Sequence, residues 1–86
     1  MPDTTDFSQY TFATPAQFRL RFLGYLDASW SEELGGADID HLCLGADSAV
    51  TIVTAHIVDQ AGLLGLLNRL YGLGFPLLSV ECLHVG

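Results

Sequence analysis

The chain has 86 residues, of which 50% are hydrophobic and 15% charged, and its formal net charge at pH 7 is −7. This length suits one domain and leaves no room for two. The only cations are three arginines, too few for a basic stripe, so the composition argues against nucleic acid and membrane partners. So small and apolar a domain is expected to bury surplus surface by self-association.

Residues 1–16 are rich in Asp, Thr, Ser and Pro, which predicts a flexible N-terminal arm. Phe7, Tyr10 and Phe12 could instead anchor this arm on a neighbouring subunit, as a swapped segment. Residues 17–86 then form a single α+β domain. The start of the chain is acidic and polar rather than signal-like, so we expect a cytoplasmic protein.

Alternating and β-rich runs predict four strands, and a leucine-rich run predicts one long helix. Asp27 or Ser29 could cap a short helix that Gly35 and Gly36 end. The strand at 49–58 and the one before it, separated by a turn, should form a hairpin. The expected strands are 18–26, 37–44, 49–58 and 77–83, with a short helix at 30–34 and a long one at about 60–73.

The long helix has clear start and stop signals. Asp59 stands at the N-cap position, and Gly74 followed by Pro76 ends the helix. One broad stripe of side chains should pack on the sheet; it comprises Leu63, Leu66, Leu67, Leu70 and Leu73. Gly65 lies on the opposite side, where another backbone could approach.

The element order is β, short α, β, β, α, β, which predicts a two-layer ferredoxin-like sandwich with a reduced first helix. One long helix covers about half of one sheet face, and the other face should be apolar. We therefore expect a homodimer or higher oligomer, with sheets packed face to face. The predicted interface residues are Leu23, Tyr25, Ile52, Leu77 and Leu83.

A spaced pattern runs from about Phe18 to Val80. Its most specific parts are Asp59-Gln60-Ala61, Gly65-Leu66-Leu67 and Pro76-Leu77-Leu78-Ser79-Val80, preceded by Leu26-Asp27 and Trp30-Ser31. This pattern resembles a group of short bacterial proteins, from cyanobacteria and other phyla, with the motifs LD..WS..L.G..I, DQAALHGLL and LGLPLLSV. The resemblance implies no activity, and Leu64 stands where the group often has His.

Two His/Cys pairs are the best candidates for chemistry. His41 with Cys43, and Cys82 with His84, each share one strand face, and His56 could join them as imidazole and thiolate ligands of a soft metal. The predicted topology places the two pairs on opposite sheet edges, and neither has knuckle spacing. We therefore expect reduced thiols and no metal or cofactor, unless the cluster forms across subunits.

The leading hypothesis is a non-catalytic, self-associating module for protein assembly or for binding a regulatory ligand. A second is a small dimeric enzyme with a pocket between sheet and helix, lined by Arg21, Tyr25, Trp30 and His56. A third is an accessory subunit that captures another protein through its N-terminal arm.

Overall fold

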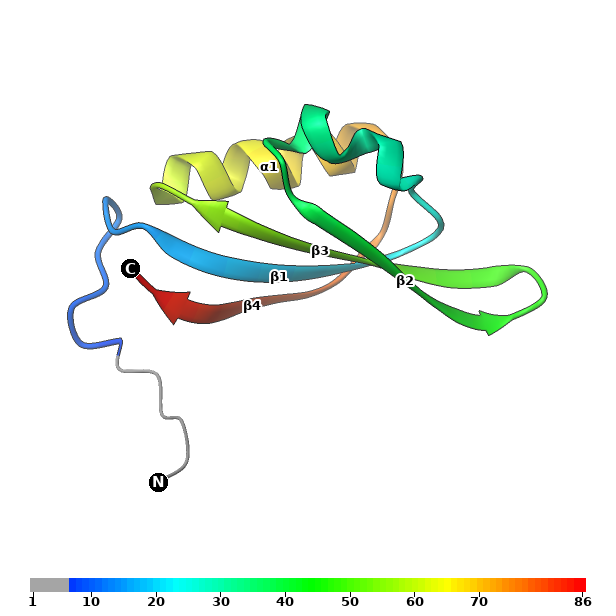
Figure 1. Cartoon of the computed structure of the whole chain (residues 1–86), viewed down its shortest axis with the longest axis horizontal. Coiled ribbons are helices and arrows are strands. Elements are labelled where there is room, and N and C mark those ends of the chain that lie inside the picture. Colours follow the sequence, from blue (N-terminus) through cyan, green and yellow to red (C-terminus); the bar gives the residue numbers. More distant parts are fainter. Residues whose placement is uncertain (1–6) are drawn as a thin grey trace, which may run out of the picture.

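The computed structural model describes residues 7–86, which fold into a four-stranded sheet with a helical layer on one side (Figure 1). The elements are strand β1 (Ala16–Leu23), 3₁₀ helix η1 (Ala28–Leu34), strands β2 (Asp38–Gly45) and β3 (Ser48–Ile57), helix α1 (Gln60–Gly72) and strand β4 (Leu77–Val85). The predicted α+β class is thereby confirmed, with one main helix.

The strand order across the sheet is β2-β3-β1-β4, and every neighbouring pair is antiparallel. The expected hairpin of β2 and β3 is present. Strands β2 and β4 are therefore the two edges. Strand β4 is irregular, because its register against β1 shifts between Gln17 and Phe18 and again between Arg21 and Phe22. Such bulges increase the local twist of a strand.

Strand β1 ends earlier than the alternating pattern predicts. We expected it to continue through Gly24 to Leu26, but it stops at Leu23. Gly24 adopts a φ of 123°, which takes the chain out of the sheet. A Cβ atom at this position would lie 2.7 Å from the ring of Phe75, so both the backbone and the close contact require glycine.

The first helical element is a 3₁₀ helix of seven residues without a side-chain cap. The expected cap from Asp27 or Ser29 is wrong, because the Ser29 hydroxyl donates to the Asp27 carboxylate instead. Gly35, in the left-handed region, ends the element. Ser31 fixes the exit of the chain, since its hydroxyl donates to the carbonyl oxygen of Ala37 at 2.6 Å.

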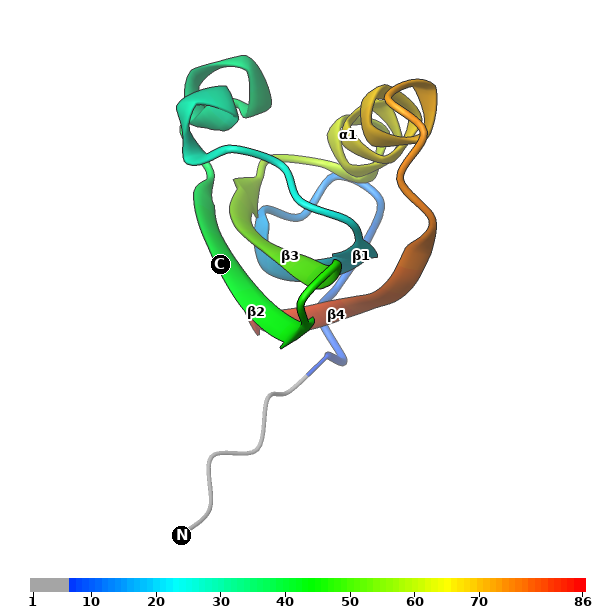
Figure 2. The same ribbon diagram turned by 90° about the vertical axis from the view of Figure 1, so that its right-hand side faces the viewer.

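Helix α1 begins at its cap: the carboxylate of Asp59 accepts a hydrogen bond from the backbone N–H of Gly62 at 2.8 Å. Leu63, Leu66 and Leu70 are buried against the sheet. Leu73, placed in the same stripe by the sequence, stays 39% exposed because the helix has ended at Gly72. Figure 2 shows η1 above the β2 side of the sheet and α1 above the β4 side.

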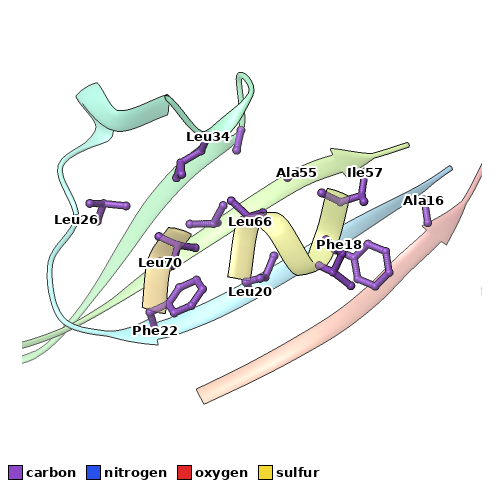
Figure 3. Close-up of a cluster of buried hydrophobic side chains, with 13 residues drawn as sticks. Ala16, Phe18, Leu20, Phe22, Leu26, Leu34, Ala55, Ile57, Leu66 and Leu70 are labelled. Carbon is purple, nitrogen blue, oxygen red and sulfur yellow. The ribbon is translucent and has the colours of Figure 1, made fainter. Parts of the chain in front are cut away.

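The core lies between α1, η1 and the covered face of the sheet. Alternate residues of the two central strands face it, and the leucines of α1 pack on them from above (Figure 3). The central members, each at most 2% exposed, are Ala16, Leu20, Phe22, Val53 and Leu70. Thr51 is the single buried polar residue in the described part of the chain, at 0% exposure.

The uncovered face of the sheet is more polar than expected. Arg19 and Arg21 project from β1 there and contact the carboxylate of Glu81, at 4.0 and 3.6 Å. The alternating pattern also assigned Leu77 to this face, which is wrong. Its register pairs Leu77 with Phe22, a core residue, so Leu77 lies on the helix side. The ion-paired centre argues against a dry, face-to-face contact between two sheets.

The described part of the N-terminal arm contacts its own domain. The carbonyl oxygen of Phe12 accepts from the backbone N–H of Gln60, at 2.8 Å, and Tyr10 packs edge-to-face on Phe18. Phe7 is 49% and Phe12 81% exposed. Residues 1–6 of the predicted arm lie outside the described residues, and a swapped arm stays a prediction.

Candidate functional site

The four side chains predicted to line one pocket are not gathered in the structure. Arg21 lies on the uncovered sheet face, and Trp30 packs from η1 against the core. Tyr25 lines a shallow hollow beside the turn between β2 and β3, whereas His56 lines a cavity between η1 and α1. These placements separate Tyr25 and His56 into two different sites.

Tyr25 has a defined environment of its own. Its ring stacks on His41, with ring centroids 4.1 Å apart and planes 15° from parallel. The Nε2 atom of His41 lies 2.6 Å from the carbonyl oxygen of Leu26. Because a carbonyl oxygen can only accept, Nε2 must carry the proton and donate. His41 thus has a structural partner beside the aromatic ring.

Thr51 holds the loop that carries Tyr25, a role the sequence did not reveal. Its Oγ1 donates to the carbonyl oxygen of Gly24 at 2.7 Å and accepts from the backbone N–H of Leu26 at 2.9 Å. One buried hydroxyl therefore forms hydrogen bonds with a backbone group on each side of Tyr25. A lone threonine inside a β-rich run gives no sequence signal for such a role.

The candidate metal ligands lie on different strands. His41 and Cys43 belong to β2, Cys82 and His84 to β4, and His56 to β3. Since β2 and β4 are opposite edges, the two pairs do not meet within one chain. Across residues 7–86 no group of three His, Cys, Asp or Glu side chains is arranged to hold a metal. Both cysteines are thiols.

The predicted interface residues are scattered. Leu23 is 40% and Tyr25 61% exposed, near one end of the sheet, whereas Ile52 and Leu83 are half-buried. Leu77, 48% exposed, is the first residue of β4 and lies on the helix side of the sheet. The five residues do not form one surface.

Two other surfaces stand out, one on each flank of α1. The first, the inter-helix groove, is a cavity of about 360 Å³ between η1 and α1, with Leu34, Gly62, Gly65, Leu66 and Arg69 among its lining residues. The second, the β4 surface, comprises Tyr71, Leu77, Leu78 and Val80, exposed by 81, 48, 53 and 40%. Tyr71 and Leu77 also line a cavity of about 400 Å³ beside Phe22 and Phe75.

From the sequence we singled out Gly65 but neither surface as a whole. We expected another backbone to approach Gly65, yet nothing lies within 4 Å of the Cβ position there. Arg69, four residues further along α1, was not considered. Its spacing from Gly62 and Gly65 places all three residues on one flank of a helix. This spacing is the sequence feature that could have predicted the groove.

Residues 17–81 match the family model described as "Domain of unknown function (DUF8691)". The chain belongs to this family. The match extends from Gln17 in β1 to Glu81 in β4, and so includes every residue named for the two surfaces. No curated protein and no solved structure shows a significant match.

Within residues 7–86, no helix is long and apolar enough to cross a membrane. The longest, α1, has 13 residues, whereas a spanning helix needs about 20.

Proposed function

We propose that this DUF8691 chain is a self-associating module that forms a homodimer through its β4 surface. The observation that carries the proposal is a run of exposed apolar side chains along β4 that continues onto α1. Leu77, Leu78 and Val80 follow one another along β4, and Tyr71 extends the surface onto α1. An exposed apolar edge strand is normally covered by a partner.

The distribution of charge distinguishes the two edges. The opposite edge, β2, also exposes two leucines, Leu42 and Leu44, at 53 and 58%. It carries in addition the exposed carboxylates Asp38 and Asp40, and charged residues protect an edge strand from pairing with another chain. On β4 the one carboxylate, Glu81, is neutralised by Arg19 and Arg21. For a chain with a net charge of −7, two copies repel each other least at β4.

The contact we propose rests on side-chain burial rather than on a continuous backbone ladder. The two register shifts leave β4 in regular register with β1 only between Phe18 and Arg21. The cavity lined by Phe22, Leu67 and Phe75 offers a recess for an apolar side chain of a second copy. In a twofold dimer each subunit would supply both the recess and the protruding side chain.

We also propose that the fold is a reduced ferredoxin-like sandwich. The antiparallel order β2-β3-β1-β4 supports this, because it places β3 between β1 and β2, which run parallel to each other. In this interpretation η1 takes the place of the first helix. A relationship to the short bacterial proteins and a cytoplasmic location stay predictions.

The test is the oligomeric state, measured by light scattering after size-exclusion chromatography and by native mass spectrometry at micromolar concentration. Leu78→Lys should convert the dimer to a monomer. A half-exposed leucine buried by each subunit contributes roughly 1 kcal/mol, so removing both should raise the dimer Kd at least about tenfold. Leu42→Lys is the matched control, because Leu42 lies on the other edge strand and is equally exposed, at 53%.

The wild-type and Leu42→Lys proteins should both be dimers. A monomeric wild type contradicts the proposal outright. A dimer that Leu78→Lys leaves intact, and that Leu23→Lys disrupts, would return the interface to the uncovered sheet face.

A further inference from the structure

The inter-helix groove has the composition of a small ligand site. Its floor is formed by buried apolar side chains, Leu34 from η1, Ile57 from β3 and Leu66 from α1. Its volume, about 360 Å³, lies at the lower end of the range for small-molecule pockets. Figure 2 shows η1 and α1, which both contribute lining residues, next to each other on the same side of the sheet.

Glycines keep the groove open on its helix side. Gly62 and Gly65 both line it, so α1 presents its backbone there instead of side chains. Nothing lies within 4 Å of a Cβ atom added to Gly65. A glycine in the middle of a helix costs about 1 kcal/mol relative to alanine. No packing contact in the described structure accounts for that cost, but access to the groove does.

Arg69 supplies the charge of the groove. Its guanidinium donates to the carbonyl oxygen of Glu33, across the groove, and has no carboxylate of residues 7–86 within 4.0 Å. The other two arginines both contact Glu81. A guanidinium has five N–H donors in a planar fork, so one bond to a carbonyl leaves several for a carboxylate.

We propose that the inter-helix groove binds a small amphiphilic monocarboxylate, with its apolar body on the leucine floor and its carboxylate on Arg69. A single guanidinium matches one carboxylate better than a phosphate, which normally needs more positive charge. The net charge of −7 does not prevent this, because salt at physiological strength screens charges beyond about 8 Å. This proposal does not depend on the dimer.

Glu33 makes the charge assignment testable. It lines the groove on the η1 side and is exposed. Its own carboxylate opposes an anionic ligand, so replacing it with glutamine should tighten binding. Removing the charge of Arg69 should weaken binding. The two substitutions therefore change the affinity for one carboxylate in opposite directions.

The probes are octanoate, octan-1-ol and octylammonium, which share one alkyl chain and differ in the charge of the headgroup. We would measure their Kd values for the whole chain by calorimetric titration and by amide chemical-shift changes in NMR. Octanoate should bind at least about tenfold more tightly than either of the others, the difference expected for a charge-assisted hydrogen bond. The shifted amides should be those of Gly62, Gly65 and Arg69.

Gly65→Leu should abolish octanoate binding, because the new side chain fills the groove. Gly72→Leu is the matched control: the same substitution on the same helix, also with nothing within 4 Å, but outside the groove. Arg69→Gln should weaken octanoate about tenfold or more. Its control, Arg19→Gln, changes the net charge equally and should leave the affinity unchanged.

Several results would overturn the proposal. One is that octanoate shows no binding in the millimolar range. Another is that octan-1-ol binds as tightly as octanoate, or that octylammonium binds more tightly. A third is that Gly65→Leu and Gly72→Leu reduce the affinity for octanoate equally. If Arg69→Gln lowers the melting temperature, the comparison of Gly65→Leu with Gly72→Leu still tests whether the groove binds octanoate. Both of these variants keep the hydrogen bond between Arg69 and the carbonyl oxygen of Glu33.

Discussion

The hydroxyl of Thr51 connects the sheet to the loop that carries Tyr25, and Thr51→Val removes it with little change in shape. The substitution deletes the bond donated to the carbonyl oxygen of Gly24, at 2.7 Å, and the bond accepted from the backbone N–H of Leu26, at 2.9 Å. Leu26 is 4% exposed, so water does not replace the lost partner. We expect the folded state to be destabilised and the stacking of Tyr25 on His41 to loosen.

The loss of stability can be worked out from the two backbone groups that lose their partner, the carbonyl oxygen of Gly24 and the N–H of Leu26. Each hydrogen bond contributes roughly 1 kcal/mol net, and a buried N–H without a partner costs about 1–3 kcal/mol. The expected loss is therefore about 2–4 kcal/mol from the free energy of unfolding. Small domains have a free energy of unfolding of about 5–15 kcal/mol, so the variant should still fold but unfold at a much lower urea concentration. Thr51→Ser keeps the oxygen and should lose only about 1 kcal/mol.

The assay is urea unfolding at one fixed protein concentration, followed through the fluorescence of Trp30, the single tryptophan. Thr54→Val is the matched control, since Thr54 lies on the other face of β3 and is half-buried. It should change the free energy of unfolding by less than about 0.5 kcal/mol. If Thr51→Val costs no more than Thr54→Val, the hydroxyl does not hold the loop.

Three further substitutions test the fold by the same unfolding assay. Gly24→Ala should cost at least about 1–3 kcal/mol, because of the φ of 123° and the contact with Phe75, and an unchanged midpoint would contradict this. Asp59→Ala should cost about 1 kcal/mol by removing the cap of α1, with a parallel loss of helical circular dichroism. Leu70→Ala, at a fully buried position, should cost about 2–5 kcal/mol, and a loss below 1 kcal/mol would mean that α1 packs elsewhere.

The sequence predicted the four strands, the two helical segments and their order, because the longer elements carry clear local signals. Alternation identifies the strands, and Asp59 and Gly74 delimit α1 to within about one residue. The α+β class follows from that order. These features depend on neighbours in the chain, which a sequence displays directly.

The faces of β4 were harder to predict, because they depend on long-range register. A bulge shifts the side-chain alternation by one residue, and β4 contains two register shifts. Strict alternation of side chains along the strand therefore placed Leu77 on the same face as Ser79, which is the wrong face. The sequence therefore predicted self-association through the uncovered face of the sheet, whereas the structure favours an apolar surface at the β4 edge.

The sites themselves were the least predictable part. Arg69 binds across to η1, and Thr51 binds to the loop after β1, so each role depends on a contact between segments far apart in sequence. Tyr25 and His56 were expected together as lining residues of one pocket between the sheet and the helix. In the structure they line different cavities, since the loop after β1 and the end of β3 lie apart.

The two proposed surfaces lie on opposite flanks of α1, which predicts that they act independently. Gly62, Gly65 and Arg69 line the inter-helix groove, whereas Leu67 and Tyr71 face the β4 surface. A helix with its side chains is about 10 Å wide, and effects of substitutions that far apart usually add. Leu78→Lys should therefore leave the octanoate Kd within about twofold of wild type, and Gly65→Leu should leave the dimer Kd equally unchanged.

Titrations of octanoate into the monomeric variant, and light scattering of the groove variant, measure the two effects separately. A monomer that binds octanoate normally shows that one chain contains the whole groove. If Leu78→Lys weakens octanoate as strongly as Gly65→Leu does, the ligand site requires both subunits. The carboxylate would then belong to the dimer interface, and the separation of the two flanks of α1 would be wrong.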